Sequence, residues 1–222
     1  MQKAWEIDEA TVGRLRNQEN WQGSFYELGL AFALQQLNQQ RRSQLLQEVW
    51  NTPYLQGVVR ERKDFGKSWL PPAAASTEAD HHCYGCIRLN NGQIIGCGSL
   101  FIEVKSITWF VFYIPLGMLD LVFPVNYPIS KQNNPWRVEI DNRLASLGMR
   151  IYRTFPFELG AIGEEAGAVV SLERLQEEVS SDDGLLVPER LFHQLRLSPR
   201  GSRSPEGLWW TGGNSEKKYE GA

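Results

Sequence analysis

Apolar residues recur at near-helical spacing in the first third of the chain, at Leu28, Phe32, Leu34 and Leu37. Ser24 is a candidate N-cap, and Glu27, three residues later, would complete a capping box. A second helix is predicted over residues 41–50, with an inner face made of Leu45, Leu46, Val49 and Trp50, and Pro53 would end it. We therefore expect residues 1–70 to form a helical region that packs on the rest of the chain.

The pattern changes from helical to alternating after residue 80. Asn91-Gly92 is typical of a two-residue hairpin turn, because both positions of such a turn need positive φ. This turn would place Cys86 opposite Cys97. Alternation then assigns one face to Ile87, Leu89, Ile94, Leu100, Ile102 and Val104, and the other face to Arg88, Phe101, Glu103 and Lys105.

Residues 107–114 are apolar on both faces, which is typical of a central strand. A helical stripe follows within 138–153, at Ile140, Leu144, Leu147, Ile151 and Tyr152. The patterns together predict an α+β fold. Its antiparallel sheet would be centred on the 86–97 hairpin and on strand 107–114, and helices from the N-terminal region and from 138–153 would cover it.

Composition suggests how the chain is divided. Residues 71–80 resemble a linker, residues 81–196 would form the α+β core, and both would belong to one structural domain. Within the core we expect another strand at 155–161 and another helix at 172–179. The tail, 197–222, is rich in Ser, Gly, Pro and charge and should be mostly flexible. Its exception is the anchor Leu208-Trp209-Trp210, which should return to the chain's own surface or dock on another molecule.

Charge and cysteine content limit the function classes. The net charge of −3 offers no general attraction for nucleic acid. The first residues lack a signal-peptide pattern, and three cysteines cannot all pair within one chain, so we expect a bacterial-type protein of the reducing cytoplasm. Residues 107–125 are apolar enough to resemble a membrane span. Because Pro115, Gly117, Asp120 and Pro124 interrupt them, we expect a buried strand and no membrane partner.

The segment 80–86 is the richest in potential metal ligands. His81, His82, Cys83 and Cys86, with Cys97 across the hairpin, are residue types that bind zinc. Residues three apart on a strand point to opposite faces, however, and a second ligand pair of regular spacing is missing. We expect buried free thiols and no cofactor, with a zinc site as the alternative.

A second candidate site combines adjacent glutamates with the tryptophans of the tail. Glu164 and Glu165 lie between glycines, within a stretch from 157 to 189 that holds nine Asp or Glu residues. Such a stretch could attract a partner with a basic surface. We expect Glu164, Glu165, Trp209 and Trp210 to be partner-binding residues.

No complete catalytic signature is present: the chain lacks a dinucleotide-binding loop, a Walker-type sequence and a nucleophile elbow. The leading hypothesis is therefore a protein-interaction protein, such as an adaptor, an inhibitor or an immunity-like protein. One alternative is a small metal-dependent enzyme that would use His81, His82 and Glu164 or Glu165, which must then converge in one cleft. Another is a self-associating structural subunit.

Overall fold

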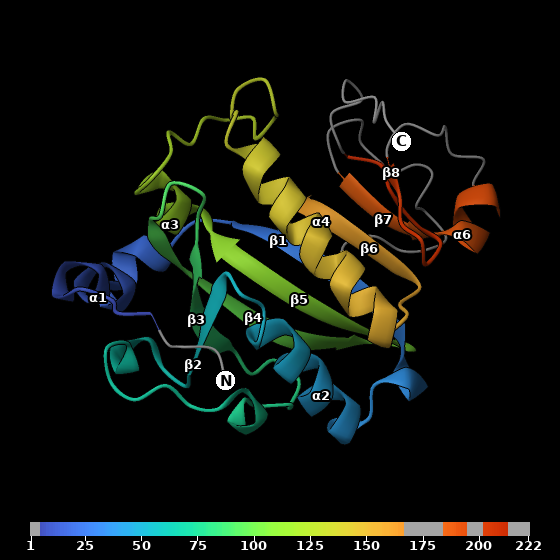
Figure 1. Cartoon of the computed structure of the whole chain (residues 1–222), viewed down its shortest axis with the longest axis horizontal. Coiled ribbons are helices and arrows are strands. Elements are labelled where there is room, and N and C mark those ends of the chain that lie inside the picture. Colours follow the sequence, from blue (N-terminus) through green and yellow to red (C-terminus); the bar gives the residue numbers. More distant parts are fainter. Residues whose placement is uncertain (1–4, 167–183, 195–201, 213–222) are drawn as a thin grey trace.

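The computed structural model describes residues 5–166, 184–194 and 202–212. Within these residues, nine strands form one antiparallel sheet in the order β2-β3-β4-β5-β1-β6-β7-β9-β8 (Figure 1). The strands are β1 (Phe25–Ala33), β2 (Leu55–Val59), β3 (Cys83–Arg88), β4 (Ile94–Val104), β5 (Ile107–Pro115), β6 (Leu159–Glu164), β7 (Gly184–Pro188), β8 (Ser202–Arg203) and β9 (Leu208–Trp210). The expected α+β class, with an antiparallel sheet and covering helices, is confirmed.

The helices pack on both faces of this sheet. They are α1 (Glu9–Arg16), α2 (Gln39–Trp50), α3 (Leu116–Asp120), α4 (Arg137–Thr154) and α6 (Glu189–Gln194), with short 3-10 turns η1 (Gln18–Trp21), η2 (Leu34–Gln36), η3 (Arg62–Asp64) and η4 (Pro72–Ala74). Figure 1 shows α2 and α4 lying across one face. Trp50 of α2 fits over Gly85 there, whereas Trp21 and Met118 fill the space beside Gly96 on the opposite face.

The helix expected from Ser24 to Leu37 is wrong, because Phe25–Ala33 is strand β1 in the interior of the sheet, between β5 and β6. Residues 26–32 are all buried, so both faces of the strand needed apolar side chains. A run that is apolar on both faces fits a buried strand as well as a helix. Since β2 also comes from residues 1–70, this region builds the sheet as well as covering it.

The register of the central hairpin is also wrong by one residue. Leu89 N–H donates to the Gln93 carbonyl (2.8 Å), which leaves three residues in the loop instead of two, with Gly92 at φ 84°. Cys86 therefore lies opposite Gly96, and Cys97 lies opposite Gly85. Because a one-residue slip exchanges the faces of a strand, Phe101 shares the face of Ile87 and is buried, whereas Leu100 is partly exposed on the other face.

Other elements follow their sequence patterns. The helices expected at 41–50 and 138–153 are α2 and α4, and the central strand expected at 107–114 is β5. The strand expected at 155–161 begins later, as β6. The helix expected at 172–179 lies outside the described residues, as does most of the tail. In the part of the chain that the structure describes, no helix is long and apolar enough to cross a membrane.

Candidate functional site

The sheet opens into a hollow where β2 and β3 diverge. The last pair between these strands is Val59 with Tyr84, but the chain before β3 continues along β4, where Asp80 N–H donates to the Phe101 carbonyl (2.8 Å). The resulting hollow has a volume of about 560 Å³. We call it the notch, and its lining residues are Val58, Val59, Arg60, Ala74, Ala75, Ser76, Glu78, Asp80, His81, His82, Cys83 and Tyr84.

Backbone groups at the notch are left without strand partners. Arg60, His81 and His82 make no backbone-to-backbone hydrogen bond with any described residue. Unpaired N–H and C=O groups beside a strand end can accept an added strand. The notch thus combines a cavity with backbone groups, just beyond the ends of β2 and β3, that pair with no other described backbone group.

One wall of the notch is aromatic. The rings of His82 and Tyr84 stack with centroids 5.7 Å apart and planes 7° apart. The side chain of Tyr113, on β5, extends across β4 at Gly98 to reach His82. The distance between Tyr113 Oη and His82 Nδ1 is 2.6 Å. Gly98 makes this crossing possible, because a Cβ at that position would lie 2.4 Å from the Tyr113 ring.

This arrangement holds His82 in place. Burial raises the pKa of Tyr113 well above its ordinary value, so the phenol keeps its proton and forms a hydrogen bond with Nδ1 in which either group can be the donor. Burial and the neighbouring Arg62 lower the pKa of His82 below 6.5, so the ring is neutral at pH 7. The other ring nitrogen, Nε2, is a donor or an acceptor according to the tautomer.

Charged side chains stand on both sides of the notch. Glu78 forms an ion pair with His81 (3.2 Å), whose Nδ1 also lies 3.3 Å from Ser76 Oγ. Arg60 and Asp80 are exposed, and neither forms an ion pair with a described residue. Asp80 has φ 60°, a conformation that Asp tolerates better than most residues.

The cysteine candidates do not come together as expected. Cys83 and Cys97 share one face of the sheet and Cys86 lies on the other, so the expectation that Cys83 points away from both is wrong. All three are buried, as predicted, and none forms a disulfide with another described cysteine. Burial raises the pKa of Cys83 to about 11, which disfavours the thiolate that binds zinc. Among the described residues, no three His, Cys, Asp or Glu side chains are grouped so as to hold a metal ion.

The paired glutamates lie far from the histidines. Glu164 ends β6, and β1, β5 and β4 separate that strand from β3, so the convergence required for a metal-dependent enzyme is not present. Glu164 accepts a hydrogen bond from the Ser24 hydroxyl. Glu165 is exposed and has φ 49°.

The tryptophans of the tail return to the chain's own sheet. In β9, Trp209 pairs with Val187 and Trp210 with Leu186 of β7. Trp210 is only 3% exposed. Trp209 remains partly exposed and stacks on Phe192 of α6, with ring centroids 4.2 Å apart. Of this pair, Trp209 alone offers a surface to a partner.

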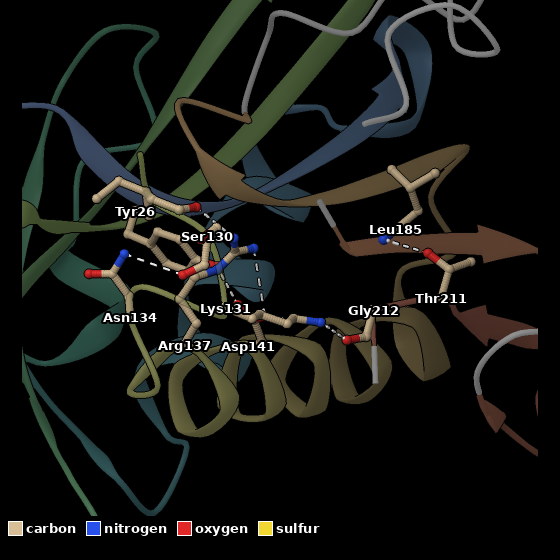
Figure 2. A network of polar contacts seen from close by, with 10 residues as sticks. Tyr26, Ser130, Lys131, Asn134, Arg137, Asp141, Leu185, Thr211 and Gly212 are labelled. Atoms are coloured by element: carbon tan, nitrogen blue, oxygen red, sulfur yellow. Dashed lines mark hydrogen bonds and ion pairs between the residues drawn. The ribbon is translucent and has the colours of Figure 1, made fainter. Parts of the chain in front are cut away.

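A buried polar network joins α4 to β1 (Figure 2). Arg137 Nε donates to the Tyr26 hydroxyl (2.7 Å), which donates in turn to Asp141. Lys131 donates to the carbonyl of Gly212, after β9. The Arg137 and Asp141 residues are 1% and 2% exposed, so the network is too enclosed to meet a ligand, and we assign it a structural role.

The sequence pointed to His81, His82 and Cys83 but missed the rest of the notch. The sequence analysis treated Tyr113 only as part of an apolar strand. The one sequence signal for its contact with His82 is Gly98 on the neighbouring strand, which has no side chain to block the Tyr113 ring. No family model, no curated protein and no solved structure matches the chain.

Proposed function

We propose that the protein is a protein-interaction protein, an adaptor or inhibitor, that captures an extended segment of a partner protein in the notch. The observation that carries this proposal is the unpaired backbone of Arg60, His81 and His82 beside a cavity of about 560 Å³. A partner segment that adds to a sheet edge gains main-chain hydrogen bonds, and side-chain pockets then give it specificity.

The lining suits such a segment. Val58, Val59, Ala75 and Cys83 are buried and supply apolar contacts, while His82 and Tyr84 are partly exposed and supply ring surfaces. The volume falls within the range of about 300–1,000 Å³ that is common for ligand sites. The notch is thus large enough for several side chains of a partner.

The proposal also covers the cellular compartment of the protein and a second surface that would contact the partner outside the notch. Three free thiols suit a reducing compartment, which supports a cytoplasmic protein. A basic surface of the partner would contact the acidic stretch 157–189, of which residues 167–183 lie outside the described residues. Glu164, Glu165 and Trp209 are the members of the expected partner-binding set that remain at least partly exposed, and we propose them as secondary contacts.

Peptide selection tests the proposal. A displayed library of random peptides, selected on the full chain, should yield extended binders whose affinity falls about tenfold or more when Ala74→Trp fills the notch. Ala74 is exposed, so the larger side chain can be accommodated without unfolding the core. The readout is the Kd of each selected peptide, measured by fluorescence anisotropy.

The matched control is Ala73→Trp, because Ala73 lies on the same turn and is exposed but does not line the notch. Its peptide affinities should equal those of the unmodified protein. If no peptide is selected, or if both variants bind the selected peptides equally well, the notch is not the docking site.

A further inference from the structure

Exposed apolar side chains gather on the loop that joins α3 to α4. Figure 1 shows this loop projecting at the top of the view, beyond α3 and the start of α4. Five large apolar residues are exposed in the described part of the chain, and three of them lie on this loop or in the first turn of α4: Leu121 (42%), Tyr127 (66%) and Val138 (38%). Beside them, Val122, Phe123, Val125 and Ile129 are partly exposed. We call residues 121–138 the apolar loop, because apolar residues that gather on one exposed segment mark an interaction site.

Hydrogen bonds within the apolar loop hold it in shape. Asn134 is fully buried, and its side chain accepts from the N–H of Asn126 (2.8 Å) and donates to the carbonyl of the same residue (2.7 Å). Trp136 Nε1 donates to the carbonyl of Pro124 (3.2 Å). A loop that is already tied down loses little conformational entropy when it binds. Tyr127 is therefore presented to a partner in a fixed position.

The apolar loop is almost free of charge, and this favours a second copy of the chain as its partner. Within residues 121–136 the only charged side chain is Lys131, which donates to the carbonyl of Gly212. The acidic residues nearest in sequence, Asp120 and Glu139, lie outside this range. The whole chain has a net charge of −3, but two copies that meet at this loop oppose no like charges across most of the contact.

We propose that the protein forms a symmetric dimer in which the apolar loops of two copies pack against each other, with Tyr127 of each copy at the two-fold axis. In such a contact the same surface serves both sides, so one apolar loop per chain is sufficient. Tyrosine is a common anchor of protein interfaces, because its ring buries a large apolar area and its hydroxyl can form a hydrogen bond. The inference goes beyond the proposed function, since no residue of the apolar loop lines the notch.

The first test is the oligomeric state of the full chain. Sedimentation velocity from about 1 μM to about 1 mM should show an equilibrium between monomer and dimer. Tyr127→Ser should raise the Kd of the dimer about tenfold or more, because it removes the anchor ring. The side chain is 66% exposed, so this replacement should leave the fold intact, which thermal unfolding checks.

Two leucines provide a matched comparison. Leu121 and Leu34 are both 42% exposed, but Leu34 follows β1 at the end where Ala33 pairs with Ile107, whereas the apolar loop follows the other end of β5. Leu121→Gln should raise the Kd of the dimer several-fold, by about 1 kcal/mol of lost apolar burial. Leu34→Gln should leave it unchanged.

A pair of charged variants tests the symmetry of the contact. Tyr127→Lys and Tyr127→Glu should each be monomeric when alone, because like charges would meet at the two-fold axis. An equal mixture of the two should form a dimer, because opposite charges then meet. Native mass spectrometry distinguishes the mixed dimer from either variant alone, since the two chains differ in mass.

Three results would overturn the inference. The unmodified chain could stay monomeric at the highest concentration, which would assign the apolar loop to a different molecule. Leu34→Gln could weaken association as much as Leu121→Gln, or the mixture of charged variants could stay monomeric although the unmodified chain dimerises, and either would place the contact elsewhere. Peptides selected on the notch should bind the Tyr127→Ser variant as tightly as the unmodified protein, so the docking site and the dimer stand or fall separately.

Discussion

Replacement of Arg137 by Met should lower the free energy of unfolding by about 3–5 kcal/mol, because it removes the cation from a buried network and leaves the carboxylate of Asp141 poorly compensated. The Tyr26 hydroxyl, which donates to Asp141, also loses the donor Arg137 Nε. Urea denaturation followed by tryptophan fluorescence measures the change.

Two companion variants show whether burial is the cause. Arg150, on the same helix as Arg137, forms a partly exposed ion pair with Glu48 of α2. Arg150→Met breaks this pair and should cost at most about 1 kcal/mol. The double variant Arg137→Met with Asp141→Leu removes both charges and should be more stable than Arg137→Met alone. Equal losses for Arg137→Met and Arg150→Met would show that the network does not hold α4 on the sheet.

Gly98→Val should destabilise the fold by about 3 kcal/mol, at the upper end of the usual cost of overpacking. A Cβ at this position would lie 2.4 Å from both Cζ and Oη of Tyr113, so the ring must leave its place over β4. The variant should also lose the contact between Tyr113 and His82, and with it most of its affinity for notch-binding peptides. Thermal unfolding and peptide anisotropy measure the two effects.

The controls for Gly98 separate crowding from backbone effects. Tyr113→Leu removes the distal ring atoms, so the added cost of Gly98→Val should be much smaller in that background. Gly13→Ala, in α1, places its Cβ in open space and should stabilise the protein by about 0.5–1 kcal/mol. If Gly98→Val costs as much without the tyrosine as with it, the crossing of Tyr113 is not the reason for this glycine.

The sequence predicted helices and strands best where one face of the element is exposed to solvent and the other is buried. The helix α4 presents a single apolar stripe, and of its expected inner residues Ile140, Leu144, Leu147 and Ile151 are buried, whereas Tyr152 is partly exposed. The strand β1 could not be identified in this way, because Tyr26 to Phe32 is buried on both faces and its apolar residues also match a helical period. Its position between β5 and β6 depends on pairing with distant segments, which a local pattern does not contain.

The hairpin shows how a small local difference changes a predicted site. One extra loop residue beside Gly92 shifts the pairing, and the predicted neighbours Cys86 and Cys97 fall on opposite faces. The notch was partly visible, since His81, His82 and Cys83 were singled out for their chemistry. Its cavity depends on where β2 leaves β3, and the position of His82 depends on Tyr113 from another strand, so neither could be predicted from spacing.

Amide hydrogen exchange and cross-strand NOEs, measured by NMR on the full chain with and without a selected peptide, test the central claim most directly. We predict that the amides of Arg60, His81 and His82 exchange quickly in the free protein and become protected on binding. We also predict NOEs between the peptide backbone and residues 81–82. A peptide that binds tightly without protecting these amides, and whose NOEs arise elsewhere on the surface, would contradict the claim.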